Sequence, residues 1–520
     1  MSTLLEFRPG EAAMDLVSLI DEHARIRTGK ECLRSDKISW SYGAFSVQTR
    51  KAASALQALG VGAGDRVGLM CLNTSGFVLA LFAAWRLGAV VVPINHKLQT
   101  PEVNYILGHA EVKLCVVDGQ LAHHATAVSH KCLWIVTDSE AEHLQLLERL
   151  VEQADPLPFG TGASGELLAE ILYTSGTTGK PKGCLHTHRN VFMTALCTAT
   201  GMSITDADKF LIAMPIWHAS PLNNWLLGVL MMGGTAVLLR EYSPEGFVHA
   251  INTHRTTLVF GSPIAFLSPL GVVSEAARHD LGHVRAWVCG GGPLSAEVAQ
   301  RLIRSYRMTQ FFQVYGMTET GPLGTLLPPS DALRKAGSIG YAGLPGVSLR
   351  LQHASGRECA SGEVGEILLR SPASMQGYLN DSKAYKEAFD DQGFYRTGDL
   401  ARRDDDGYLF IVDRARDMIV TGGENVYSKE VEDALSEHPE IAEVAVLGIP
   451  HVEWGETVVA VVAGRAQTSL DAESLRAFLA PRLARYKIPR IFYIREAGEL
   501  PRTATGKVRK HVLRDELTDR

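Results

Sequence analysis

Along the first 340 residues, helical patterns of apolar residues alternate with short runs rich in valine, leucine and isoleucine. Residues 41–59 and 78–87 have the apolar spacing that predicts helices. Short apolar runs bounded by turn residues predict strands at residues 66–72, 89–94, 113–118, 132–138, 209–215, 235–239, 256–263 and 284–291. Strands that alternate with helices favour largely parallel sheets covered by helices. The pattern therefore predicts an α/β fold.

The pattern changes after about residue 340. Residues 362–372 and 407–420 predict antiparallel strands joined by Gly-rich or acidic turns. From residue 428 the order becomes helix, strand, strand, helix and strand, at residues 428–438, 442–450, 456–464, 470–484 and 490–496. This part is long enough for a small α+β domain of about 100 residues. We place the boundary within residues 413–418.

The most apolar segment, residues 76–94, contains Arg86 in its middle and Pro93 near its end. These two residues favour a buried helix followed by a strand over a membrane span. The N-terminus carries Glu6, Arg8 and Glu11 and lacks the apolar stretch of a signal peptide. Residues 152–166 form the best candidate for a linker-like loop.

The composition adds exclusions. The 520 residues carry a net charge of −6, which gives no basis for a nucleic-acid or anionic-membrane partner. Eight cysteines are scattered without a C-x-x-C pair. This usage favours a reduced, cytoplasmic setting over a disulfide framework.

Residues 173–183 read YTSGTTGKPKG, with glycines among hydroxyls and two lysines. Such a loop lets backbone N–H groups, hydroxyls and ammonium groups approach a phosphate, although a polar surface turn has a similar composition. It is not a Walker loop, because only two residues separate Gly176 from Gly179 and because Pro181 follows Lys180. Pro181 also predicts that an extended segment, and not a helix, follows the loop.

The full string TSGTTGKPKG resembles the signature loop of the acyl-adenylate-forming superfamily, which includes acyl-CoA synthetases, nonribosomal adenylation domains and firefly luciferase. Further motifs of that family follow in order: GGGPL at residues 290–294, QVYGMTET at 313–320, YRTGDL at 395–400, DRARDM with the GGEN that follows it at 413–425, and LPRTATGKVRK at 500–510. Within the family, PINHKL and YGMTET are similar to bacterial carnitine/crotonobetaine-CoA and aryl-CoA ligases. The resemblance runs from about residue 56 to residue 510.

The resemblance implies a large N-terminal domain of αβαβα layers with a β-barrel-like subdomain, and a small mobile α+β C-terminal domain. It places the AMP-binding domain at residues 1–413, a hinge at 414–416 and the C-terminal domain at 417–520. Arg416 stands where the family has a hinge Asp or Lys, and we expect the small domain to swing about it.

The resemblance also implies the roles of the nucleotide-site residues. Tyr315 would stack near the adenine, Thr318 would bond the α-phosphate, and Asp399 with Arg414 would hold the ribose. A carboxylate suits ribose because it only accepts hydrogen bonds. The whole set expected to bind ATP or AMP is Thr174, Ser175, Gly176, Thr177, Thr178, Gly179, Lys180, Lys182, Gly291, Gly292, Pro293, Tyr315, Gly316, Thr318, Asp399 and Arg414. Gly292 departs from the alanine that is frequent there.

Three residues carry the expected catalytic roles. Lys507 matches the family's C-terminal lysine, which would reach the carboxylate of the acid and the α-phosphate. The need is physical, since a carboxylate must attack a polyphosphate that repels it. Glu319 would hold Mg²⁺, a hard cation that prefers oxygen ligands. His218 would sit between the acyl pocket and the thiol tunnel.

The acyl pocket is expected to include Trp217, Asn223, Gly261, Gly316 and Gly321. Trp217 is equally well interpreted as a core residue, Asn223 and Asn224 as a helix start, and the glycines as needed only for backbone shape. The family's nonribosomal domains for α-amino acids usually carry an Asp near this segment to hold the amino group. No Asp occurs between Asp208 and Asp280, so the resemblance argues against an α-amino acid. The sequence does not identify the acid.

Lys97, Gly422, Gly423, Glu424 and Trp454 are expected to line the coenzyme A tunnel. Ile488 stands where some aryl-CoA ligases carry Arg, so that phosphate contact is either missing or supplied by Lys487 or Arg490.

The resemblance thus implies an ATP- and Mg²⁺-dependent ligase. It would make acyl-AMP from a small carboxylic acid and pass the acyl group to coenzyme A. Three alternatives stay open: a stand-alone enzyme that loads a carrier protein, a luciferase-like oxygenase and a non-catalytic nucleotide binder. The oligomeric state, a homodimer included, is not determined by the sequence.

Overall fold

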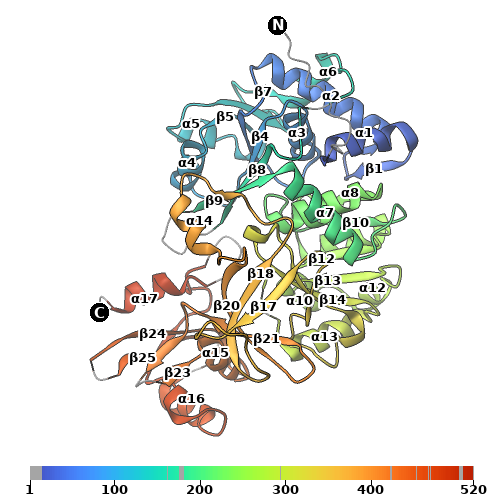
Figure 1. The fold of residues 1–520 in the computed structure, drawn as a ribbon. Coiled ribbons are helices and arrows are strands. Elements are labelled where there is room, and N and C mark those ends of the chain that lie inside the picture. Colours follow the sequence, from blue (N-terminus) through green and yellow to red (C-terminus); the bar gives the residue numbers. More distant parts are fainter. Residues whose placement is uncertain are drawn as a thin grey trace. The chain divides into compact units, whose positions relative to one another are not determined.

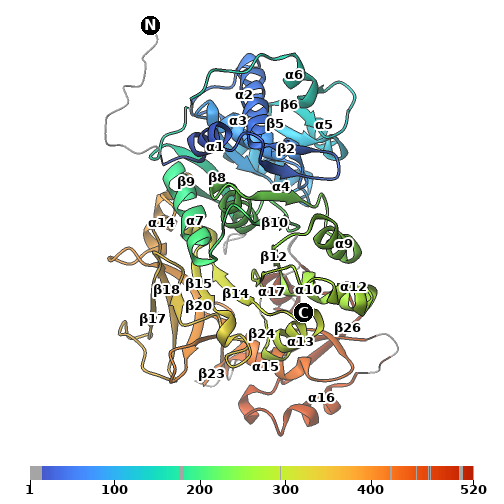
Figure 2. The same cartoon turned by 90° about the vertical axis from the view of Figure 1, so that its right-hand side faces the viewer.

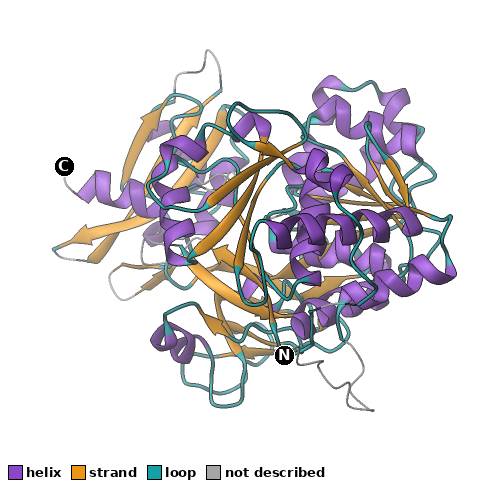
Figure 3. Cartoon of the chain, turned by 90° about the horizontal axis from the view of Figure 1, so that it is seen from above, coloured by secondary structure: helices purple, strands orange, loops and turns teal. Residues whose placement is uncertain are grey.

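The computed structural model describes residues 14–518, except 161, 175–180, 293, 422–423, 453, 466–467, 469 and 503–507, and except the side chains at 276 and 279. The chain forms two compact units. The first unit comprises residues 1–349 and 369–395, and the second unit comprises residues 350–368 and 396–520. Figure 3 shows the helices and strands of the chain by colour.

The first unit contains two mainly parallel sheets. The nine-stranded sheet has the order β16 (Ala342–Gly343), β15 (Gly324–Leu327), β14 (Phe311–Gly316), β13 (Ala286–Cys289), β12 (Leu258–Gly261), β10 (Lys209–Ile212), β11 (Thr235–Leu238), β1 (Glu31–Arg34), β2 (Ser39–Ser41). The eight-stranded sheet has the order β19 (Gly377–Tyr378), β9 (Lys182–Thr187), β8 (Leu168–Thr174), β4 (Val90–Pro93), β3 (Arg66–Met70), β5 (Val112–Asp118), β6 (Leu133–Thr137), β7 (Gln145–Leu146). Each strand predicted in this part is present, so the α/β interpretation is confirmed.

One layer of helices is buried against both sheets, and in Figure 1 and Figure 2 its first three helices lie together. It comprises α1 (Leu16–Ile26), α2 (Tyr42–Ala58), α3 (Ser75–Arg86), α6 (Leu147–Gln153), α7 (His188–Gly201) and α8 (Leu227–Met231). Every residue of α3 after Ser75 is buried, as expected for a helix that is apolar all round. Arg86 is held inside by a bidentate pair with Asp21, at 2.6 and 2.8 Å. The buried helix expected in place of a membrane span is confirmed.

Outer helices cover the remaining sheet faces. The eight-stranded sheet carries α4 (Thr100–His109) and α5 (His124–Ala127), and the nine-stranded sheet carries α9 (Pro244–His254), α10 (Pro263–Leu267), α11 (Pro269–Val272), α12 (Glu275–His279) and α13 (Ala296–Tyr306). The first unit thus has the expected αβαβα layers. Its remaining elements are α14 (Ser382–Ala388), the π-helical segment η2 (Ser220–Leu226) and the single turns η1 (Gly119–Leu121), η3 (Thr318–Thr320) and η4 (Pro329–Asp331).

The second unit contains two further sheets. The strands β17 (Ser348–Gln352), β18 (Val364–Arg370), β20 (Tyr395–Arg403) and β21 (Leu409–Arg414) form a four-stranded sheet, which occupies the place of the expected barrel-like subdomain. The other sheet consists of β23 (Glu424–Val426), β22 (Ile419–Thr421), β25 (Gly455–Gly464), β24 (Ile441–His451) and β26 (Ile491–Arg495). The helices α15 (Ser428–Ser436), α16 (Ala472–Leu479) and α17 (Lys510–Thr518), with η5 (Arg485–Lys487), complete the expected small α+β part.

In the described part of the chain, no helix is long and apolar enough to cross a membrane.

Candidate active site

The parallel strands of the nine-stranded sheet end at one edge, and four sequence motifs follow these ends. β10 leads to His218, β12 ends at Gly261, β13 leads to Gly291, and β14 carries Tyr315. Carboxyl ends of parallel strands are the usual ligand-binding edge of α/β sheets. The N–H of Gly290 donates to the carbonyl of Gly261 at 3.2 Å, so the segment expected at adenine lies beside an expected acyl-pocket residue. Pro293 lies outside the described residues.

The turn after β14 is tightly packed. Gly321 has φ +67°, and a Cβ there would lie 2.4 Å from the carbonyl oxygen of Ala373. A Cβ at Gly316 would lie 2.7 Å from the carbonyl oxygen of Pro322. Packing of the backbone therefore explains both glycines, and their place in the acyl pocket stays a prediction.

The phosphate loop connects two described strands. β8 ends at Thr174, β9 begins at Lys182, and these two residues pair across the antiparallel ladder. Residues Ser175 to Lys180 lie outside the described residues. The strand after Pro181 confirms that the loop leads into an extended segment.

Glu319 lies close to the flank of this loop. It is 7% exposed, and the Tyr378 hydroxyl donates to its Oε1 at 3.2 Å. The Nζ of Lys182 lies 5.1 Å from the centre of the Tyr378 ring and 4.0 Å from the Oδ2 of Asp381. Burial, followed by the charge of Glu319, raises the pKa of Tyr378, which therefore stays a hydrogen-bond donor. The sequence interpretation missed Tyr378, which lies 59 residues after Glu319 in the chain.

The residues around Glu319 suit magnesium in donor chemistry. Among the described residues, no group of three His, Cys, Asp or Glu side chains gathers as a metal cage. One carboxylate is sufficient when Mg²⁺ keeps several waters and binds substrate phosphates. Glu319 is thus a fitting protein ligand for magnesium carried by ATP.

A second cluster stands where the two sheets meet. The indole N–H of Trp217 donates to Nδ1 of His96 at 3.0 Å, and the rings of Trp217 and His218 lie 3.7 Å apart. Because indole is only a donor, Nδ1 of His96 accepts and its proton lies on Nε2. Burial, followed by the charge of Lys97, lowers the pKa of His96 to about 4 and keeps it neutral.

Asn73 links the ends of strands from the two sheets by hydrogen bonds. Its amide donates to the carbonyls of Ile212, Met214 and Leu239 at 3.1 to 3.3 Å, and it accepts from the N–H of Ile216 at 2.9 Å. This buried side chain follows β3 and fixes the start of the segment that carries Trp217 and His218. The sequence interpretation assigned neither Asn73 nor His96, although His96 lies next to Lys97 in PINHKL.

The expected ribose pair is assembled in the second unit. Asp399 on β20 and Arg414 on β21 are direct cross-strand partners, and Nε of Arg414 lies 2.8 Å from Oδ1 of Asp399. Asp399 is 3% exposed. Two residues 15 positions apart are therefore brought together by strand register.

A buried network lies on both sides of the expected hinge. Asp413, just before it, accepts from the N–H and hydroxyl of Ser428 at 2.5 and 3.0 Å. Nζ of Lys510 donates to Ser428 Oγ and lies 2.6 Å from Oε1 of Glu432. Arg416 itself is half exposed and lies 3.8 Å from Asp417. Residues 396–413 thus group with the C-terminal residues as one compact unit, whereas the division at residue 413 stays a prediction.

The structure describes three of the residues expected to line the coenzyme A tunnel, namely Lys97, Glu424 and Trp454. Trp454 is 39% exposed and lies 4.2 Å below the guanidinium of Arg490. Lys487 pairs with Glu430 at 2.7 Å, which leaves Arg490 the better candidate for the missing phosphate contact. Glu424 is exposed on β23, and Lys97 is exposed beyond β4. Gly422, Gly423 and the catalytic candidate Lys507 lie outside the described residues.

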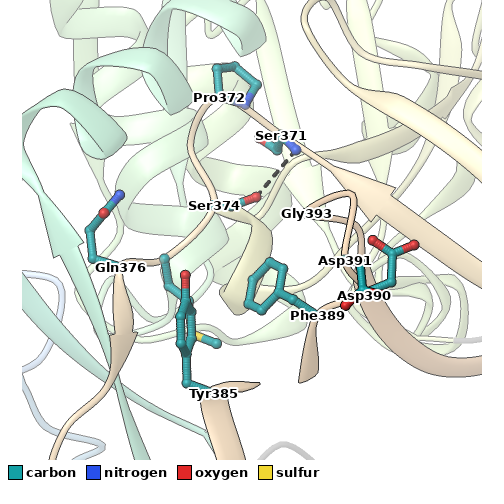
Figure 4. A pocket seen from close by; sticks show the side chains of 10 residues that line it. Ser371, Pro372, Ser374, Gln376, Tyr385, Phe389, Asp390, Asp391 and Gly393 are labelled. Carbon is teal, nitrogen blue, oxygen red and sulfur yellow. Dashed lines mark hydrogen bonds between the residues drawn. The ribbon is translucent and has the colours of Figure 1, made fainter. Parts of the chain in front are cut away.

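Figure 4 shows a pocket of about 490 Å³ in the first unit. It is lined by Ser371, Pro372, Ser374, Met375, Gln376, Tyr385, Phe389, Asp390, Asp391 and Gly393. The N–H of Met375 donates to the carbonyl of Glu319, so the pocket borders the site, although none of the predicted site residues lines it.

Comparison with known proteins agrees with this geometry. The model of the AMP-binding enzyme family matches residues 20–379, and that of the AMP-binding enzyme C-terminal domain matches residues 430–507. An indoleacetate–CoA ligase of Aromatoleum aromaticum is 36% identical over 96% of this chain and 98% of its own length. A long-chain-fatty-acid–CoA ligase of Mycobacterium tuberculosis is 35% identical over 93% of this chain and 94% of its own.

A solved structure has the same fold. The o-succinylbenzoate coenzyme A synthetase of Bacillus subtilis, in complex with ATP and magnesium ion, has a TM-score of 0.84 and 29% identity, with 96% of this chain and 99% of that chain covered. The motifs, the layered fold and these relatives agree: the chain belongs to the AMP-binding enzyme family and is an ATP-dependent, AMP-forming carboxylic acid–CoA ligase.

Proposed function

We propose that the residues assembled above divide between the two half-reactions of this ligase. In the first, a carboxylate oxygen of the acid attacks the α-phosphorus of ATP, and pyrophosphate leaves. In the second, the thiol of coenzyme A attacks the acyl carbonyl, loses its proton and displaces AMP. Net charge and burial patterns do not decide the acid.

The observation that carries the proposal is the grouping of Glu319, Tyr378 and Lys182. It joins the flank of the phosphate loop to the turn that carries Thr318. Cationic and hydrogen-bonding groups fixed at a phosphate chain stabilise the charge that develops during phosphoryl-type transfer. Magnesium, when bound with ATP at Glu319, neutralises part of that charge.

In the proposed first step, residues 174–180 and Lys182 hold the β- and γ-phosphates as the leaving group. Lys507 approaches the attacking oxygen and the α-phosphate. Tyr315 and residues 291–293 bind the adenine, and the Asp399–Arg414 pair binds the ribose hydroxyls.

In the proposed second step, the segment around His218 lies at the junction of the acyl pocket and the tunnel through which the thiol enters. Lys97, residues 422–424 and Trp454 line the thiol tunnel. The guanidinium of Arg490 extends the aromatic surface of Trp454, a combination that suits an adenine ring and a neighbouring phosphate.

We further propose that the small domain reorients about Arg416 between the steps, so that Lys507 serves the first and residues 422–424 the second. The Asp413–Ser428 contact would have to open or rotate in that motion. We propose that the enzyme acts in the cytoplasm.

The test is a panel of fatty, aryl and polar carboxylic acids, assayed for ATP-dependent pyrophosphate release with and without coenzyme A. The proposal expects release that depends on an acid, and acyl-CoA as the product. Acyl transfer to a carrier protein at a higher rate than to coenzyme A would assign the acceptor differently. Absence of acid-dependent pyrophosphate release across the panel would contradict the proposal.

A further inference from the structure

Four polar side chains in the interior of the first unit form what we call the buried polar cluster: Glu170, His186, Asn223 and Asn224. They are 0%, 1%, 1% and 2% exposed. Each has a buried atom without a hydrogen-bond partner in the described part of the chain, namely Glu170 Oε2, His186 Nε2, Asn223 Oδ1 and Asn224 Oδ1. Buried polar groups in native proteins are nearly always paired, so four unpaired atoms in one cluster need an explanation.

The orientation of both amides is fixed. The Nδ2 of Asn223 donates to Oε1 of Glu170 at 2.5 Å. The Nδ2 of Asn224 donates to Oγ1 of Thr198 at 2.7 Å and to the carbonyl of Pro322 at 3.4 Å. The carboxylate oxygen of Glu170 and the carbonyl oxygen of Pro322 accept hydrogen bonds, so the NH₂ group of each amide faces them. What each amide leaves unpaired is therefore an acceptor.

The cluster is enclosed by the elements of the candidate active site. Glu170 on β8 and His186 on β9 are cross-strand partners, and therefore point to the same face of the sheet. Thr198 lies on α7, whose Thr194 donates to the carbonyl of Gly321 at 2.9 Å. Asn224 thereby contacts both α7 and the turn at Gly321–Pro322.

Asn223 and Asn224 lie on η2 (Ser220–Leu226), a π-helical segment two residues after His218. Short π-helical segments occur frequently at functional sites. The segment turns two neighbouring amides to different walls, one toward β8 and one toward α7. Asn223 on this segment and Gly321, whose carbonyl accepts from Thr194 of α7, are both expected on sequence grounds to border the acyl group.

We propose that the amide oxygens of Asn223 and Asn224 accept a hydrogen bond from the acyl part of the substrate. The favoured acids would then carry an N–H or O–H group on the ring or chain, as indolyl, hydroxyaryl and hydroxyalkyl acids do. This inference rests on the proposed function. Glu170 is a positioning residue in it, because it holds the Asn223 amide with its oxygen free.

The physical consequence is that the enzyme would discriminate against acids that lack the N–H or O–H donor. An acid of the same shape without the N–H or O–H would leave a buried acceptor unpaired at the moment of binding, and a site built for a polar partner rejects such an analogue strongly. If an ordered water paired with these amide oxygens instead, the two acids of a matched pair would have equal kcat/KM.

The experiment compares matched acids on the full chain with ATP, magnesium and coenzyme A. Suitable pairs are indole-3-acetate with 1-benzothiophene-3-acetate, 4-hydroxyphenylacetate with 4-methylphenylacetate, and 12-hydroxydodecanoate with dodecanoate. We expect kcat/KM to favour the donor-bearing member of the accepted pair by about 10-fold or more. Asn223→Leu or Asn224→Leu should reduce that ratio to within about 3-fold, mainly through KM for the donor acid.

Asn252 provides a matched control. It lies on α9, its Nδ2 donates to the carbonyl of Ala277 at 3.4 Å, and its Oδ1 is buried and also without a described partner. Asn252→Leu should leave the acid ratio unchanged. A ratio lost equally in Asn252→Leu would overturn the specific role of the cluster.

The wild-type ratios decide the inference even where a variant does not fold. If acids react but no donor-bearing member is preferred, the inference is wrong and the proposed function stands. If no acid supports pyrophosphate release, the proposed function fails and the inference fails with it.

Discussion

The carboxyl groups in the interiors of the two units have different hydrogen-bond and ion-pair partners. In the first unit, Glu170 has one amide partner and, among the residues that the structure describes, no cationic partner; burial raises its pKa to about 7. In the second unit, Asp413 and Glu432 share Lys510 and Ser428. Burial raises the pKa of both there too, with the charge of Lys510 acting against it.

The difference separates two uses of buried polar groups. The second unit has a bridged network, which fixes helix α15 against the end of β21. The first unit keeps acceptors unpaired beside the predicted acyl site. In a network that holds backbone segments together, the polar groups form hydrogen bonds with one another. In a site for a polar ligand, some of these groups form their hydrogen bonds with the ligand.

The largest expected effect comes from breaking the network in the second unit. Lys510→Met leaves the buried Asp413 and the half-buried Glu432 without their cation, so this unit should lose about 3 kcal/mol of stability. Hydrogen exchange of residues 428–446 in the full chain measures the loss. The control is Lys487→Met, which removes the more exposed Glu430 pair of the same helix and should cost less than about 1 kcal/mol. Equal exchange in Lys510→Met and wild type would show that the network does not hold the unit.

A smaller effect is expected from Glu170→Gln, and it depends on pH. The folded pKa of about 7 lies above the ordinary value of 4.5, so the stability from the neutral form is complete below about pH 4.5 and is lost as the pH rises through 7. Gln keeps the shape without titrating. The variant should therefore gain about 2 kcal/mol relative to wild type between pH 5 and pH 8.

Thermal unfolding at the two pH values measures this gain. Glu166→Gln, on the exposed loop before β8, is the matched control and should show no such dependence. A Glu170→Gln variant that parallels wild type at both pH values would mean that Glu170 is paired as an ordinary carboxylate.

The first unit also contains buried groups with the opposite pH dependence. Burial lowers the pKa of His186 and His188 to about 4, below the ordinary 6.5. Their stabilising neutral forms are present above about pH 6.5, and the stability is lost as the pH falls toward 4. The two histidines together outweigh Glu170, so the stability of the first unit should rise as the pH increases from about 4.5 to about 7 and change little above that; a profile that is flat or falls over this range would contradict these assignments.

The smallest expected effect sharpens the comparison inside the network. Ser428→Ala removes the hydroxyl that links Asp413 to Lys510 but leaves both charges, so we expect a loss of about 1 kcal/mol. Hydrogen exchange of α15 is again the measurement. Ser436→Ala, at the exposed end of the same helix, should be close to neutral. A loss as large as that of Lys510→Met would place the hydroxyl, and not the cation, at the centre of the network.

Local pattern was sufficient for the layers of the fold. Strand–helix alternation predicted the parallel sheets, and Pro181 predicted the extended segment that became β9. These features depend on neighbours in sequence or on regular geometry.

Contacts between distant segments could not be predicted in this way. Asn73 carries no motif, yet it joins the ends of strands from both sheets. Tyr378 reaches Glu319, and His96 reaches Trp217, only because separate turns converge. The glycines at 316 and 321 had two interpretations in the sequence, and the space for a Cβ, which only the fold defines, explains them by packing.

In the proposed function, Lys507 serves the first half-reaction and not the second. The direct measurement compares Lys507→Ala with wild type and with Arg509→Ala in two assays: pyrophosphate release from acid and ATP, and thioester formation from supplied acyl-AMP and coenzyme A. The account predicts a loss of about 100-fold or more in the first assay and near wild-type rates in the second. An equal loss in both assays would contradict it.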